Sequence, residues 1–157
     1  MSGETIRPYR PEDARALSAL YEASVRELGA KRYSTAQIHA WASLTPSAER
    51  LDAKMQDGRV RLVSEDESGL LAFVDVEPDG HIDLLYAAPR AAGTGVADRL
   101  YLTAEQQAAK AGATRLYAEA SELARPFFEK RGFVTTARRD FEVAGVPIHN
   151  FAVEKAL

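Results

Sequence analysis

Residues 84–100 read LLYAAPRAAGTGVADRL, and this stretch organises the rest of the chain. A predicted strand ends at Pro89, a loop with Gly93 and Gly95 follows, and the loop opens directly into a long helix. Unpaired N–H groups at the start of such a helix attract anions, each contact adding roughly 0.3–1 kcal/mol. The two glycines lack the Cβ atoms that would hold a phosphate away from those groups. The stretch is therefore either a phosphate-binding loop or a tight strand-to-helix connection.

On both sides of this loop the hydrophobic spacing predicts further strands and helices. Period-two patterns joined by turn residues predict three strands before it, at 59–65, 70–77 and 81–88. After it we expect a helix over 95–111, a strand over 114–120, a short helix from Leu123 to Gly132, and a hairpin of 133–143 with 147–153. The N-terminal part predicts a strand over 4–9 and three helices, over 11–28, from the Ser34–Gln37 capping box, and over 45–58. This order predicts one α+β domain over 1–157, with a mixed central sheet of about seven strands flanked by helices.

The composition excludes several classes of site and partner. The chain has 157 residues, a net charge of −3 and no cysteine. Disulfides, thiolate metal sites and cysteine nucleophiles are therefore excluded, and the mixed charge does not predict binding to nucleic acid. No run approaches the roughly 20 apolar residues of a membrane span, and residues 1–9 lack the apolar core of a signal peptide. We expect a cytoplasmic protein that binds a small molecule or another protein, and neither nucleic acid nor a membrane.

Two other phosphate-binding families fit the loop poorly. A Walker loop requires a lysine followed by serine or threonine, and the chain contains neither dipeptide. A Rossmann fingerprint requires a third glycine where Asp98 stands, although Glu119 imitates the ribose-binding acid of that fold. After the strand of Glu119 the chain continues with one helix and a hairpin rather than with more strand–helix units. A dinucleotide-binding oxidoreductase is thus a weaker alternative.

The loop resembles the signature of the GNAT superfamily of N-acetyltransferases, [Q/R]-x-x-G-x-[G/A] entering a helix. Two registers fit, one beginning at Arg90 and one at Ala92. Only the second keeps the usual loop length after Pro89 and places Leu100 where the family has a leucine that packs the helix on the sheet. The resemblance then implies that the pyrophosphate of acetyl-CoA is held by Ala92, Gly93, Thr94, Gly95, Val96 and Ala97.

A second stretch, ASELARPFFEKRGF at 120–133, resembles the later motif of the same family. With YSTAQIHAW at 33–41 and NF at 150–151, it is similar to a subgroup of small bacterial acetyltransferases of unknown substrate. Phe128 stands where many relatives have a tyrosine that protonates the departing thiolate, so that role is vacant or reassigned here. Ser121 replaces an asparagine of the motif. The resemblance implies cofactor contacts from Ser121, Phe127, Phe128 and Lys130.

The catalytic base is expected on the strand that leads into the loop. His81 and Asp83 lie two residues apart and therefore share one face of that strand. An imidazole with a pKa near ~6.5 suits proton abstraction from an amine, and Asp83 could orient it or attract a cation. Glu119 is the next candidate. The alternative is an exposed histidine after a turn and a structural aspartate, and no third ligand is spaced for a metal site.

The resemblance implies an enzyme that transfers acetyl directly from acetyl-CoA to a primary amine of a small molecule or peptide. The thioester carbonyl would then accept a hydrogen bond from the strand backbone at Leu85, Tyr86 and Ala87. Tyr33, Trp41 and Asn150 are expected to line the acceptor pocket. Because Phe128 cannot donate a proton, a non-catalytic acyl-CoA-binding module is the main alternative. The resemblance also leaves room for a homodimer.

Overall fold

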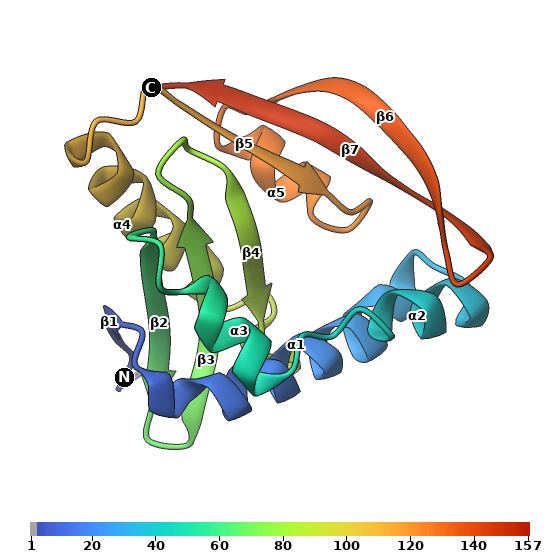
Figure 1. Cartoon of the computed structure of the whole chain (residues 1–157), viewed down its shortest axis with the longest axis horizontal. Helices are drawn as coiled ribbons and strands as arrows, with labels where there is room; N and C mark the ends of the chain where they lie inside the picture. The colour runs from blue at the N-terminus through green and yellow to red at the C-terminus, as the bar shows by residue number, and fades with distance from the viewer. Residues whose placement is uncertain (1–2) are drawn as a thin grey trace.

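Seven strands form two antiparallel sheets in the computed structural model, which describes residues 3–157 (Figure 1). The first sheet has the order β1 (Thr5–Pro8), β2 (Val60–Asp66), β3 (Gly69–Val76) and β4 (Ile82–Ala87). The second has the order β5 (Arg115–Ala120), β7 (Val146–Ala156) and β6 (Val134–Val143). The predicted α+β class and the seven strands are confirmed. Within residues 3–157, an isolated parallel bridge between His81 and Tyr117 links the two sheets.

Gly80 makes that bridge possible. Its φ of +96° is a conformation that side chains rarely adopt, and a Cβ there would collide with the Arg115 carbonyl oxygen. The Tyr117 N–H donates to the Gly80 carbonyl at 3.1 Å, which fastens β5 to the start of β4. Beyond this point the two strands run in different directions (Figure 1). The sheets are thus joined at one end of β4 and open at the other.

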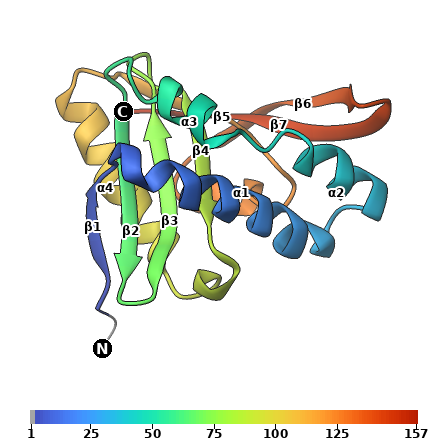
Figure 2. The same ribbon diagram turned by 60° about the horizontal axis from the view of Figure 1, so that its bottom comes forward.

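Helices cover both faces of the first sheet (Figure 2). One face carries α4 (Val96–Lys110), and the other carries α1 (Ala14–Leu28), on which α3 (Ala48–Lys54) packs. Helix α2 (Thr35–Ala42) packs on α1 and extends beyond this sheet to contact β7 (Figure 2). Alternation along β2 separates the two cores, since Leu62 packs with the α4 side and Val63 with the α1 side. Leu100 of α4 is completely buried, which contributes roughly 1.5–3 kcal/mol for a side chain of that size. Within residues 3–157 no helix is long and apolar enough to cross a membrane.

The start of the third helix differs from the prediction. The Ser34–Gln37 capping box is present as expected at the start of α2. However, α3 begins after Ser47 rather than at Thr45, because the Ser47 hydroxyl accepts the Arg50 N–H at 3.2 Å. Short elements complete the chain: 3₁₀ turns η1 (Pro11–Asp13), η2 (Gly29–Lys31) and η3 (Pro89–Ala91), and helix α5 (Arg125–Lys130).

The hairpin of β6 and β7 reaches beyond its own sheet toward α2 (Figure 1). The Gln37 amide donates to the Pro147 carbonyl at 3.2 Å. The Tyr33 hydroxyl donates to the His149 carbonyl at 3.3 Å and accepts the Glu122 N–H at 2.8 Å. These contacts tie the hairpin to the α1–α2 region and to the segment after β5. The hairpin therefore covers the space between β4 and β5 where these strands diverge.

Candidate active site

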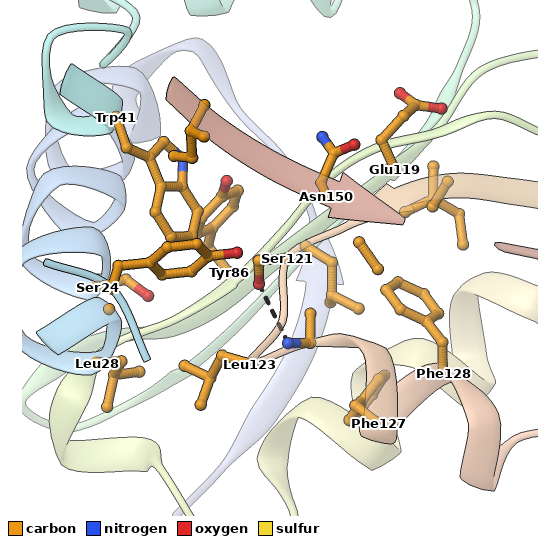
Figure 3. Close-up of a pocket in the computed structure, with 18 of the residues that line it drawn as sticks. Ser24, Leu28, Trp41, Tyr86, Glu119, Ser121, Leu123, Phe127, Phe128 and Asn150 are labelled. Atoms are coloured by element: carbon orange, nitrogen blue, oxygen red, sulfur yellow. Dashed lines mark hydrogen bonds between the residues drawn. The ribbon is translucent and has the colours of Figure 1, made fainter. Parts of the chain in front are cut away.

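A cavity of about 350 Å³ lies where β4 and β5 separate (Figure 3). Strands, helices and hairpin all contribute to its wall. Ser24, Leu28 and Trp41 lie at one end of Figure 3, and Phe127 and Phe128 lie at the other. Twelve of the side chains expected in the site line this cavity: Tyr33, Trp41, Asp83, Leu85, Tyr86, Ala87, Ala97, Glu119, Ser121, Phe127, Phe128 and Asn150.

The open edge of β4 brings backbone hydrogen-bonding groups to the cavity. The Ala88 N–H donates to the Leu71 carbonyl of β3 at 2.8 Å, and Tyr86 is paired with Phe73. Because bonding alternates along an antiparallel strand, the N–H and C=O groups of Leu85 and Ala87 point away from β3. They point to the side on which β5 has diverged. The gap therefore offers donors and acceptors that no neighbouring strand uses.

A buried aspartate shapes this edge. Val74 pairs with Leu85 but Val76 pairs with Ile82, so two residues of β4 oppose Asp75 and form a bulge. The Asp75 carboxylate is completely buried, accepts the Leu84 N–H at 2.6 Å and accepts from Arg59 at 2.7 Å. Burial raises the pKa of Asp75 to about 6, although the bond from Arg59 opposes the shift. This carboxylate replaces the backbone acceptor that the bulge removes.

The loop from Ala92 to Ala97 follows η3 and opens into α4. Gly93 and Gly95 have φ values of +75° and +83°, and Gly95 is the N-cap residue. The first hydrogen bond of α4 runs from the Arg99 N–H to the Gly95 carbonyl at 3.1 Å. The N–H groups of the helical residues before Arg99 therefore have no backbone acceptor within the helix. Ala97 lines the cavity. The N–H groups of residues 92–97, called the cradle below, thus adjoin the cavity. Leu100 is completely buried, and this is the packing that the register beginning at Ala92 requires.

His81 is held between two carboxylates. Its Nδ1 lies 2.8 Å from Glu77 and its Nε2 lies 2.9 Å from Glu119. Glu119 first and Glu77 second raise the pKa of His81 to about 9, against the effect of partial burial. The imidazole is therefore protonated at neutral pH, whereas the sequence suggested an ordinary pKa. His81 does not belong to the cavity wall, but Glu119 does, and its pKa is lowered chiefly by the bond to His81.

Asp83 has different partners although it shares a strand with His81. Asp83 lines the cavity, and its carboxylate accepts from Lys54 at 3.0 Å and from Arg59 at 3.2 Å. Asp83, His81 and Glu77 each bring one potential metal-ligand atom within 4.8 Å of the others. Glu77 is thus the third potential ligand that the sequence spacing did not reveal. All three groups already face opposite charges, so the arrangement is an ion-pair network.

An aromatic cluster forms the α5 end of the cavity. Phe128 is 3% exposed, and its ring centroid lies 5.6 Å from that of Phe127 and 4.9 Å from that of Phe133. It brings no hydroxyl to the wall. The Ser121 hydroxyl accepts the Ala124 N–H at 3.1 Å and so caps the turn that leads into α5. Lys130 is exposed in the last turn of α5 and does not line the cavity.

The opposite end contains side chains that the sequence did not identify. Ser24 and Leu28 enter from the end of α1, and Phe141 and Val143 enter from β6. Leu28 belongs to the apolar stripe of its helix, which indicates burial but not what the side chain faces. Phe141 and Val143 are two positions apart, so they share a face of β6, and this spacing was the available signal. Assigning them to a cavity required knowledge of where the hairpin folds.

Comparisons with known proteins agree on one family. A model of the acetyltransferase (GNAT) domain matches residues 29–155. A crystal structure of a GCN5-related N-acetyltransferase from Rhodopseudomonas palustris is 35% identical, has a TM-score of 0.89, and covers 100% of this chain and 98% of its own. The uncharacterised N-acetyltransferase YafP of Escherichia coli K12 is 28% identical over 96% of this chain and 95% of its own. PaiA N-acetyltransferase of Thermoplasma acidophilum, solved with coenzyme A, shares the fold at 22% identity with a TM-score of 0.77 and covers 100% of both chains.

Proposed function

The chain belongs to the GNAT acetyltransferase family, and from this we propose that it transfers acetyl directly from acetyl-CoA to a primary amine of a small molecule or peptide. One observation carries the proposal. The cavity between β4 and β5 connects the N–H cradle at the start of α4 with two carboxylates, Asp83 and Glu119. The first group suits a pyrophosphate and the second suits an ammonium ion.

The residues of the cradle fit the phosphates of acetyl-CoA. Gly93 and Gly95 adopt left-handed conformations, and around Gly93 no atom lies within 4 Å of the position that a Cβ would occupy. Thr94, Val96 and Ala97 complete the cradle in this proposal, and the edge of β4 runs on from it. That the PaiA enzyme of T. acidophilum was solved with coenzyme A supports the same assignment for this fold. Acetyl-CoA would supply the activated acetyl group.

The backbone of β4 would stabilise the negative charge of the transition state. An N–H of Leu85 or Ala87 donates to the carbonyl oxygen as the amine attacks, because these groups have no partner on β3. Ser121, Phe127 and Phe128 would contact the thiol-bearing arm from the opposite side. The C–N bond forms and the C–S bond breaks. The ammonium nitrogen releases two protons in all, one to Glu119 before attack and one to solvent as the amide forms. The thiolate takes up one proton from solvent, since Phe128 has none to give and a thiol pKa near ~8.5 makes this step inexpensive.

Glu119 would accept the proton that the ammonium must lose before attack. It lines the cavity and is ionised at neutral pH, since the bond from His81 lowers its pKa. His81 then acts as a positioning residue, because its protonated ring fixes the Glu119 carboxylate from outside the cavity. Asp83 would attract the same ammonium from β4. The three candidates thus have separate roles, two on the cavity wall and His81 behind it.

Measuring CoA release from acetyl-CoA with a panel of primary amines tests the proposal. We expect amine-dependent release and a product heavier by one acetyl group in the mass spectrum. The presence of Phe128 in place of a tyrosine favours one alternative, a non-catalytic acyl-CoA-binding module. Such a module would be stabilised thermally by acetyl-CoA but would release no CoA with any amine, and that result would remove the enzymatic assignment.

A further inference from the structure

Apart from His149, the ionisable acid and base side chains on the described cavity wall are acidic. Asp83 and Glu119 present carboxylates, and among the described residues that line the cavity none is lysine or arginine. The cations that balance these two groups approach from other directions. Lys54 and Arg59 contact Asp83, and His81 contacts Glu119, without themselves lining the cavity. The cavity wall therefore includes the two acidic residues but not their basic partners.

Arg139 of β6 lies beside the cavity wall: its guanidinium stands over the ring of Phe141, and its charge contributes to the lowered pKa of Glu119. The Arg139 guanidinium donates to the Asn150 side chain at 3.1 Å and lies outside the lining set. His149 does line the cavity, but its ring nitrogen lies 3.2 Å from a Glu122 carboxylate oxygen. No positive group on the described wall is thus left to pair with a carboxylate of a ligand.

Apart from the Ser24 hydroxyl, the remaining wall near α1 and α2 is apolar and aromatic. The rings of Tyr33 and Trp41 meet edge to face with centroids 5.4 Å apart, and the Tyr33 hydroxyl is occupied by backbone groups. Leu28, Phe141 and Val143 surround them. An apolar ligand body would lose its hydration there against a mainly apolar wall.

We propose that the acceptor is a small primary amine with an apolar or aromatic body and no carboxylate group. This inference rests on the proposed function and names its substrate class. The ammonium is attracted by Asp83 and Glu119, and the body lies toward Trp41 and Leu28. The α-carboxylate of a free amino acid would be placed near two like charges without a counter-ion, and this repulsion excludes it.

Matched amine pairs test the substrate class. Phenethylamine is compared with phenylalanine and tryptamine with tryptophan, in assays of CoA release with product mass as confirmation. We expect kcat/KM to be at least about tenfold higher for the uncarboxylated member of each pair, which corresponds to roughly 1.4 kcal/mol or more. Because the members share a body and an amine, the difference reports the carboxylate alone.

Two variants locate the origin of the discrimination. Asp83→Asn removes one carboxylate from the wall and should raise KM for tryptamine while narrowing the tryptamine-to-tryptophan ratio. Glu142→Gln removes the same charge from an exposed position on β6 outside the cavity and should leave the ratio unchanged. Acetyl-CoA affinity, measured by calorimetry, should be unaltered in both variants. A ratio unchanged by Asp83→Asn would overturn the role given to that carboxylate in selecting the amine.

The outcomes separate this inference from the proposed function. Equal or better turnover of the carboxylated amines, or turnover confined to peptide N-termini, would overturn the substrate class while leaving the acetyltransferase reaction established. Tight acetyl-CoA binding without turnover of any amine or peptide would instead overturn the proposed function, and the substrate class would fall with it.

Discussion

The two ends of the cavity are built from different parts of the chain. The cradle end consists of backbone: Gly93, Gly95 and the first turn of α4, followed by the edge of β4. The acceptor end consists of side chains from α1, α2, β5 and the hairpin, among them Trp41 and Glu119. The first depends on one short contiguous stretch, and the second depends on where distant elements meet. Substitutions at the first should therefore change cofactor affinity, and substitutions at the second should change turnover and selectivity.

Gly95→Glu should have the largest effect and should act on affinity alone. The new side chain adds bulk and a negative charge where the phosphates would lie, at a position with a φ of +83°. We expect acetyl-CoA affinity measured by calorimetry to fall at least about a hundredfold, because like charge opposes binding at a helix N-terminus. Circular dichroism should show a folded protein, since the loop is at the surface.

Gly112→Glu provides the matched control for that variant. Gly112 follows the other end of α4, also has a positive φ, and has no atom within 4 Å of the position that a Cβ would occupy. It shares the positive φ and the added charge but lies far along the helix from the cradle; a Cβ at Gly95 would in addition require the Arg99 side chain to shift, since it would lie 2.7 Å from Nη1. If the two variants lost equal affinity, the assignment of the loop to phosphate binding would be wrong.

The same contrast explains what could be predicted from sequence. The cradle was predictable because glycines, a strand end and a helix start are consecutive, and local rules govern them. The bridge at His81 was not predictable, because it depends on contact between Gly80 and Arg115, which lie 35 residues apart in the sequence. For the same reason the sequence suggested an ordinary histidine, whereas contacts from Glu77 and Glu119 raise its pKa to about 9. Strand spacing placed residues on a face but could not supply their partners.

Glu119→Gln should have the largest effect at the acceptor end. The amide keeps the shape of the side chain but accepts no proton, so kcat should fall about 10²-fold while acetyl-CoA affinity stays unchanged. With Glu119 as base, kcat/KM of the wild type should show no rise through the pKa of His81. If His81 were the base, kcat/KM would rise as pH passes about 9, because only the neutral ring accepts a proton. Stopped assays from pH 6 to 10 distinguish the two assignments.

Phe128→Tyr should produce a smaller change, confined to the departure of the thiolate. The ring is 3% exposed and packs on Phe127 and Phe133, so a hydroxyl should be accommodated only on the side that faces the cavity. We expect unchanged acetyl-CoA affinity and a kcat that is kept or raised by less than about tenfold, with the larger gain at high pH. A loss of more than tenfold would mean that the phenyl ring itself contacts the cofactor in a way that the hydroxyl disrupts.

His81→Gln should have the smallest effect and should appear in stability as a function of pH. The folded-state pKa of His81 is about 9, above the unfolded value of 6.5, so its contribution is fully present below about pH 6.5. It is lost as pH rises from there through about 9. The variant should therefore be less stable than the wild type by roughly 1–2 kcal/mol near pH 6, a range that allows for the exposure of Glu119. Urea unfolding measured near pH 6 and again near pH 9.5 gives the difference at both limits.

Glu119, one of the two glutamates that His81 contacts, sets the lower boundary of that window. The pKa of Glu119 is lowered by the same bond, so its contribution is present above the ordinary glutamate value and is lost as pH falls toward the folded-state pKa. The difference between wild type and His81→Gln should consequently be greatest between these two limits and should vanish above about pH 10. Asp75 titrates within the window, but it is present in both proteins and cancels. A difference in stability that stayed constant from pH 6 to 10 would mean that His81 acts through packing on Tyr117, at a ring separation of 4.9 Å, and not through its charge.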